Sequence, residues 1–155
     1  MSYTHTVTLP LPWEESVQRT RDALAEQGFG ILSEINVRAT FEAKLGADAA
    51  AAVGDYVILG ACNPALASRA LAAEPELGAL LPCNVVVRRG KDDAVTTIDA
   101  IDPQTIVQLS DSPAVRDVAN DADTRLRNAL AALAGLTESG TGTGTAAGTA
   151  ATPQP

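Results

Sequence analysis

The sequence predicts an α+β fold, a two-layer sandwich with a mixed or antiparallel sheet of about five strands and helices mainly on one face. Short apolar or alternating stretches of strand length recur between stretches of helical periodicity. The turn GKDD, residues 90–93, joins two of these strands in a way typical of an antiparallel hairpin. Apolar residues make up 46% of the 155 residues, which is enough to build the core of one domain.

The first half of the chain is expected to form strands and helices in alternation. The ranges are 3–9 (strand), 13–27 (helix), 29–37 (strand) and 40–45 (a short helix capped by Thr40). Gly28 suits the left-handed position that closes the first helix. Alternation in the second strand places Glu34 on the face opposite Ile31 and Ile35. The alanine run 47–52 favours helix but is too short to form one alone.

The second half continues with an apolar strand of the kind buried inside a sheet. The expected strands are 55–61, 84–89 and 94–101, with helices at 64–73 and 113–136 and a brief helical turn at 102–103. Asn63 and Ser112 are predicted to cap the two helices that follow them. The last helix carries an apolar stripe formed by Val115, Val118, Ala119, Ala122, Leu126, Leu130 and Leu133. Residues 1–136 therefore form one domain, and the Gly/Thr/Ala-rich residues 137–155 are expected to be a disordered tail.

The chain's only two cysteines each precede an asparagine, in Cys62-Asn63 and Cys83-Asn84. Cys62 ends one predicted strand and Cys83 precedes the next. If these strands are adjacent and antiparallel, both dipeptides lie at one edge of the sheet. Cys62 also lies just before a helix start, whose partial positive charge favours the thiolate. We therefore expect a polar pocket in which Cys62 is the more reactive thiol and Cys83 its neighbour or resolving partner. Asn63 and Asn84 would orient a small ligand there.

Three stretches of the sequence carry a resemblance to a known family. GFGILSEINVRATFEAKLG, ILGACNPALASRAL and LLPCNVVV occur in that order over residues 28–87. In this the chain resembles the small bacterial and archaeal proteins grouped as domain-of-unknown-function family 302. The resemblance covers roughly residues 3–136, and it implies a single α+β domain and a homodimer. It implies no activity.

Ordinary packing explains the same residues without a site. Buried thiols pack as small hydrophobic groups, Asn63 is accounted for as a helix cap, and Asn84 as a tie for the loop after Pro82. On this interpretation the chain is a non-catalytic homodimeric assembly or adaptor module. Glu34, followed by Arg38, is a further candidate contact for a small ligand, and a solvated sheet face explains it as well. The sequence leaves open whether any reaction is catalysed.

No metal site is predicted, and no cofactor is implied. Structural zinc takes four Cys or His ligands and catalytic zinc usually three, whereas this chain offers two cysteines and the single His5. Alternation places His5 on the same strand face as Val7 and Leu9. Pooling of ligands across a dimer would be needed to complete a centre.

The charge balance excludes several classes of partner. The net charge is −8, and nucleic-acid binding requires a basic surface that replaces counterions on phosphate. The same balance disfavours adsorption to an anionic membrane surface. The N-terminus lacks the charged start and apolar run of a secretory signal. We expect a soluble cytoplasmic protein with reduced thiols.

Overall fold

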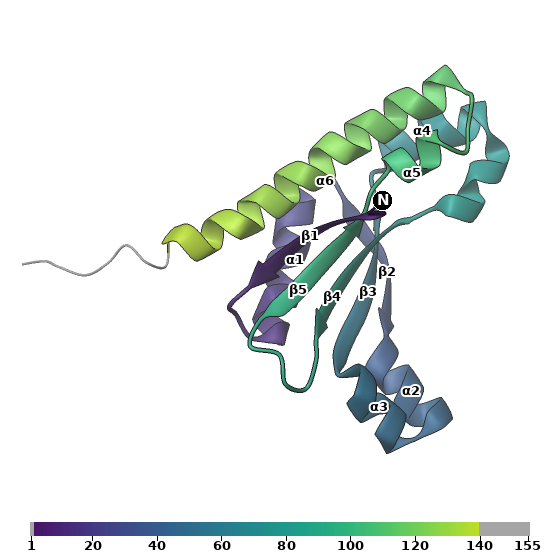
Figure 1. The fold of residues 1–155 in the computed structure, drawn as a ribbon. Helices are drawn as coiled ribbons and strands as arrows, with labels where there is room; N and C mark the ends of the chain where they lie inside the picture. The colour runs from purple at the N-terminus through teal and green to yellow at the C-terminus, as the bar shows by residue number, and fades with distance from the viewer. Residues whose placement is uncertain (1, 140–155) are drawn as a thin grey trace, which may run out of the picture.

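The computed structural model describes residues 2–139 and shows the α+β sandwich that the sequence predicts (Figure 1). Its five strands form one sheet in the order β1-β5-β4-β3-β2, and every neighbouring pair is antiparallel. The strands are β1 (Thr4–Leu9), β2 (Gly30–Asn36), β3 (Asp55–Cys62), β4 (Cys83–Arg89) and β5 (Thr96–Ile101). The predicted hairpin is the β4–β5 pair.

The helices lie mainly on one face of this sheet, as expected. They are α1 (Trp13–Glu26), α2 (Val37–Leu45), α3 (Ala47–Val53), α4 (Pro64–Ala73), the 3₁₀ helix η1 (Pro75–Leu80), α5 (Gln104–Val107) and α6 (Pro113–Ser139). The helices α1 and α6 cover one face of the sheet, α2 and α3 lie together at one end of the molecule, and α4, η1 and α5 gather at the other (Figure 1). Within residues 2–139, no helix is both long enough and apolar enough to cross a membrane.

Three local predictions need correction or extension. The helix α2 begins at Val37 and is capped by Asn36, whose Oδ1 accepts a 2.9 Å hydrogen bond from the Ala39 amide. Thr40 is therefore not the cap, because its hydroxyl already donates to the Asn36 carbonyl inside the helix. The alanine run lies in α3, which packs against α2 rather than standing alone. The helix α6 extends through Ser139, and residues 140–155 of the predicted tail lie outside the described residues.

The second strand contains a bulge that changes which side chains share a face. Its register against β3 shifts between Ile31 and Ser33. Because a bulge inserts an extra residue, it reverses the alternation beyond it. Ile31 and Glu34 therefore lie on the helix-covered face, and Ile35 faces the other way with 50% of its surface exposed. The prediction that Glu34 lies opposite both isoleucines is wrong for Ile31, since simple alternation does not anticipate a bulge.

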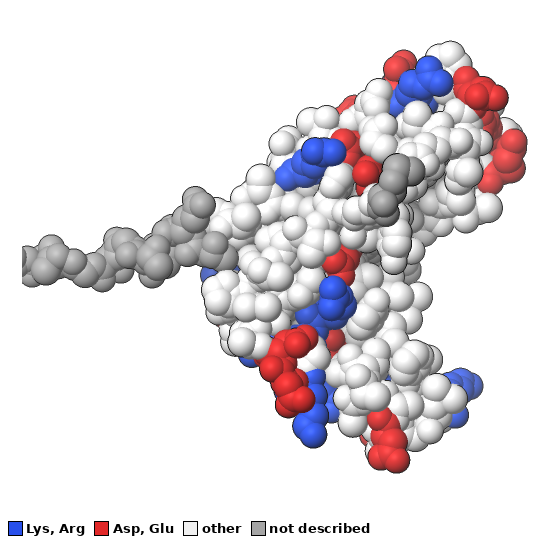
Figure 2. Space-filling model, viewed as in Figure 1, with Lys and Arg blue, Asp and Glu red and all other residues white. Residues whose placement is uncertain are grey.

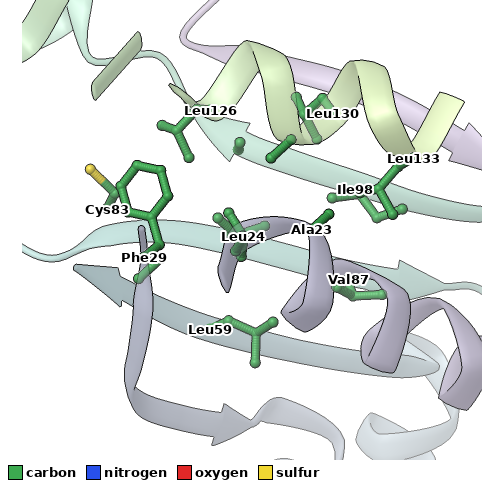
Figure 3. Close-up of a cluster of buried hydrophobic side chains, with 14 of the residues drawn as sticks. Ala23, Leu24, Phe29, Leu59, Cys83, Val87, Ile98, Leu126, Leu130 and Leu133 are labelled. Atoms are coloured by element: carbon green, nitrogen blue, oxygen red, sulfur yellow. The ribbon is translucent and has the colours of Figure 1, made fainter. Parts of the chain in front are cut away.

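The core consists of a large and a small hydrophobic cluster. The large cluster fills the space between the sheet and the helices α1 and α6, where Leu126, Leu130 and Leu133 meet Leu24 and Ile98 (Figure 3). The small cluster lies at the far end of α6 and comprises Ala70, Leu77 and Val115, with Ile106 and Val118 packed against it. The helix α6 thus contributes its apolar stripe to both clusters.

Truncation of this stripe should destabilise the domain. Leu126 is fully buried in the large cluster, so Leu126→Ala should lower the free energy of unfolding by about 2–5 kcal/mol, because it removes packing and leaves a cavity. Urea denaturation followed by circular dichroism measures this loss. Leu45→Ala is the matched control, because Leu45 is 67% exposed. Its effect should stay below about 0.5 kcal/mol; equal losses for the two variants would contradict the assigned core.

Candidate functional site

The two Cys-Asn dipeptides meet at one edge of the sheet. The strands β3 and β4 are adjacent and antiparallel, which is the condition that the sequence analysis set for this meeting, and Ala61 pairs with Cys83 in their register. Cys62 is the next residue of β3, so it follows directly at the end where β4 begins. Residues twenty-one positions apart in the chain are brought together by this single pairing.

A cavity opens where these strand ends meet the helices. Cys62, Asn63 and Cys83 line it together with Phe29 and with side chains of α4, η1, α5 and α6. Its volume is about 50 Å³, and almost all of its lining atoms are apolar. Members of both hydrophobic clusters contribute to the wall, among them Cys83 from the large cluster and Val115 from the small one. The cavity therefore lies at the junction between the two clusters.

Cys83 behaves as an apolar wall of this cavity. Its side chain is 9% exposed and lies beside the Phe29 ring (Figure 3). Burial, and secondarily negative charge on the neighbouring Cys62, raise the pKa of Cys83 from its ordinary value of 9.0 to about 11. The thiol therefore stays protonated at neutral pH, and a protonated thiol is a poor nucleophile and a poor resolving partner.

Asn63 supplies the polar part of the lining. Its Oδ1 accepts a 3.2 Å hydrogen bond from the Leu66 amide, which makes Asn63 the predicted cap of α4. Its Nδ2 lies against Gly28, where a Cβ would come within 3.0 Å of it. Gly28 also has a positive φ of 83°, so only glycine suits this position without strain. The end of α1 and the start of α4 thus meet closely beside the cavity.

The other two candidate ligand contacts do not reach the cavity. Asn84 is exposed, because successive residues of a strand point to opposite faces and Cys83 points inward. Glu34 forms an ion pair with Arg21 of α1 and lies on β2, away from the lining. The structure therefore brings together Cys62, Cys83 and Asn63 and leaves Asn84 and Glu34 outside.

The sequence analysis missed the helical part of the lining. Small side chains one helical turn apart face the cavity from two helices, Ala67 and Ala70 on α4 and Ala119 and Ala122 on α6. Such pairs leave space that longer side chains would fill. The signal was present in the sequence, but in a chain rich in alanine it does not stand out.

Comparison with known proteins agrees with this architecture. The sequence profile described as "Domain of unknown function DUF302" matches residues 5–133. The chain belongs to the DUF302 family. The crystal structure of an uncharacterized conserved DUF302 protein from Bacillus stearothermophilus superposes with a TM-score of 0.74 at 28% sequence identity, covering 84% of this chain and 98% of that one. No curated protein matches the sequence. Family membership thus fixes the domain type and leaves its activity open.

The shifted pKa of Cys83 predicts slow and strongly pH-dependent alkylation. At pH 8 only about one Cys83 in a thousand should be the thiolate, since each pH unit below the pKa reduces that fraction tenfold. Its reaction with iodoacetamide in the folded protein should be at least tenfold slower than in urea, and should accelerate up to a pH of about 11. Peptide mass spectrometry follows each cysteine separately.

The unfolded protein serves as the control, because its thiols have ordinary pKa values. The pKa of Cys83 is higher in the folded than in the unfolded protein, so the protonated thiol contributes to the free energy of unfolding below pH 9.0. This contribution is lost as the pH rises toward about 11. Alkylation of folded Cys83 at the unfolded rate near pH 8 would contradict the assignment.

Proposed function

We propose that this domain binds a small apolar molecule, or the apolar end of a larger one, in the cavity between the two clusters. The observation that supports the proposal is a cavity whose lining is almost wholly apolar but includes the Asn63 side chain and Cys62. Ligand sites in proteins combine apolar walls with a few placed polar groups in this way. Asn63 Nδ2 makes no hydrogen bond to the residues that the structure describes, and it offers a donor to a ligand carbonyl or hydroxyl.

The size of the cavity narrows the class of ligand. A volume of about 50 Å³ exceeds the roughly 10–15 Å³ that one water occupies, but it is well below the roughly 150 Å³ of an engineered cavity that takes benzene. A short alkyl chain therefore fits better than an aromatic ring. We accordingly expect a ligand with a slender aliphatic end and a polar group placed near Asn63.

The cysteines act in this proposal as ligand contacts. Thiol–disulfide exchange requires a thiolate and a leaving thiol of low pKa, and the pKa of Cys83 is raised. Cys83 is therefore better suited to apolar packing against a ligand than to acting as a resolving thiol. Redox chemistry that uses Cys62 alone would need a partner thiol from another molecule.

Filling the cavity should abolish binding. Ala67 lines the cavity from α4 and is partly exposed, so Ala67→Leu should occupy the space without disrupting the core. With 1-butanol as the probe, we expect the variant to bind at least tenfold more weakly than the wild type, about 1.4 kcal/mol. Methyl NMR of the alanines on α6 measures the dissociation constants.

Ala65→Leu is the matched control, because Ala65 is exposed on the same helix and lies outside the lining. It should bind 1-butanol as the wild type does. Benzene should bind more weakly than 1-butanol to the wild type. Unchanged binding by Ala67→Leu, or no binding of 1-butanol to the wild type, would remove the proposal.

We also propose that the domain self-associates through the edge strand β2, which would make it a homodimeric assembly module. Edge strands are commonly protected by lysine or proline, and residues 30–36 contain neither. Leu32 and Ile35 are 69% and 50% exposed there, and the single charge, Glu34, is paired with Arg21. A second copy can pair its own β2 with this strand about a two-fold axis and extend the sheet.

The shape of the molecular surface also supports a second copy of this chain as the partner. The surface is hollowed between the end formed by α4 and η1 and the end formed by α2 and α3, and most atoms in the hollow are uncharged (Figure 2). Uncharged surface with exposed aliphatic groups is typical of contacts between copies of one chain.

A charge on the edge strand should prevent this association. Leu32→Lys places a cation on both copies at the contact, so the variant should be monomeric where the wild type is dimeric. Light scattering coupled to gel filtration measures the mass. Tyr3→Lys is the control, because Tyr3 is 70% exposed and precedes β1, the strand at the opposite edge of the sheet from β2. A monomeric wild type, or dimers of both variants, would exclude this interface.

A further inference from the structure

Three chemically active side chains from distant segments converge beside α6. His5 comes from β1, Asp102 follows β5, and Asp123 lies on α6. His5 Nε2 lies 2.7 Å from Asp123 Oδ1 and 3.6 Å from Asp102 Oδ1. The three side chains are 19%, 20% and 13% exposed, and their candidate ligand atoms all lie within 4.8 Å of one another.

The backbone holds this cluster in place. His5 pairs with Ala100 across the β1–β5 ladder, on the face toward α6, so Asp102 follows just beyond the end of the same pairing. The Asp102 amide donates a 2.8 Å hydrogen bond to the Tyr3 carbonyl, and Asp102 Oδ1 accepts a 2.9 Å bond from the Gln104 amide. The β1–β5 register and the turn after β5 therefore hold His5 and Asp102 close to each other.

The charge of the cluster is incompletely balanced. Asp123 Oδ2 accepts a 3.0 Å hydrogen bond from Arg127 one helical turn later. Among the described residues, Asp102 has an ion-pair contact only with His5, and that contact is charged only when the imidazole is protonated. Both carboxylates are mostly buried and Arg127 contacts only Asp123, so a cation placed between Asp102 and Asp123 would be favourable, since burial makes unpaired charge costly.

We propose that His5, Asp102 and Asp123 bind a divalent transition-metal ion of the zinc type. One imidazole nitrogen and two carboxylate oxygens form a mixed N/O set, which zinc accepts, whereas calcium takes six to eight oxygens. Three protein ligands leave a coordination position for water or another small molecule. The sequence analysis counted two cysteines and His5 as too few ligands for a metal; of these only His5 belongs to the proposed site, because that count omitted the aspartates.

The distances suit such an ion after small side-chain movements. Metal–ligand bonds of roughly 2.0–2.2 Å place two tetrahedral donors about 3.3 Å apart, between the two distances from His5 Nε2. A neutral imidazole has one N–H, so His5 binds the ion through Nε2 when its proton lies on Nδ1, and the metal bond replaces the contact between Nε2 and Asp123 Oδ1. Arg127 can keep its bond to the other oxygen of Asp123 and so orient that ligand.

Zinc titration of the untagged, chelator-treated protein tests the proposal, and His5 is a direct reporter because it is the chain's only histidine. Equilibrium dialysis should show one zinc ion per chain, and the imidazole NMR signals of His5 should shift on binding. Asp102→Asn and Asp123→Asn should each weaken zinc binding at least tenfold. Magnesium should neither bind stoichiometrically nor shift the His5 signals.

Asp121→Asn is the matched control, because Asp121 pairs with Arg125 on α6 just as Asp123 pairs with Arg127. It should bind zinc like the wild type. Circular dichroism verifies the fold, and His5→Gln is the second variant if an asparagine variant unfolds. The proposal is overturned if the wild type binds no stoichiometric zinc, if the ligand variants bind as the wild type does, or if zinc binds without shifting His5, which would place it on the thiols.

Discussion

The architecture depends on the length of one amphipathic helix. At 1.5 Å per residue, the 27 residues of α6 span about 40 Å. The strands have six to eight residues, which at about 3.3 Å each cover roughly 20–27 Å. The sheet therefore cannot cover the whole apolar stripe, and the N-terminal part of α6 extends past it (Figure 1). The short helices α4, η1 and α5 bury that part, and so the molecule has two clusters instead of one.

This division explains why a cavity lies where it does. The sheet and α1 pack against one half of α6, and a group of short helices packs against the other half. The two halves of α6 therefore belong to separate hydrophobic clusters. The strand ends that carry Cys62 and Cys83 fall at the boundary. Alanines on α4 and α6 keep the helices close there without filling the space. Burial at this boundary also makes Cys83 a protonated, apolar group.

Sequence reasoning reached the features that depend on local pattern. The apolar stripe of α6 follows from periodicity and the Asn63 cap from capping chemistry, whereas the adjacency of β3 and β4 was only a condition, because strand order depends on tertiary packing. The bulge in β2 and the position of Glu34 did not, because a bulge leaves no mark in the alternation of seven residues. Alternation also placed His5 on the correct strand face. Which turn of α6 lies over that face is set by tertiary packing, so no count of ligand types could place Asp123 beside it.

The two proposed sites are formed by neighbouring residues of the chain, and this connects them physically. Asp102 and Asp123 belong to the His5 cluster, while their chain neighbours Pro103 and Ala122 line the apolar cavity. A cation that draws Asp102 toward Asp123 would therefore draw Pro103 toward Ala122 and narrow the space between α5 and α6. Because the cavity is only about 50 Å³, even a small movement of these walls changes the space that a ligand can occupy. Occupation of one site would then change the affinity of the other, and linkage requires that change to be mutual.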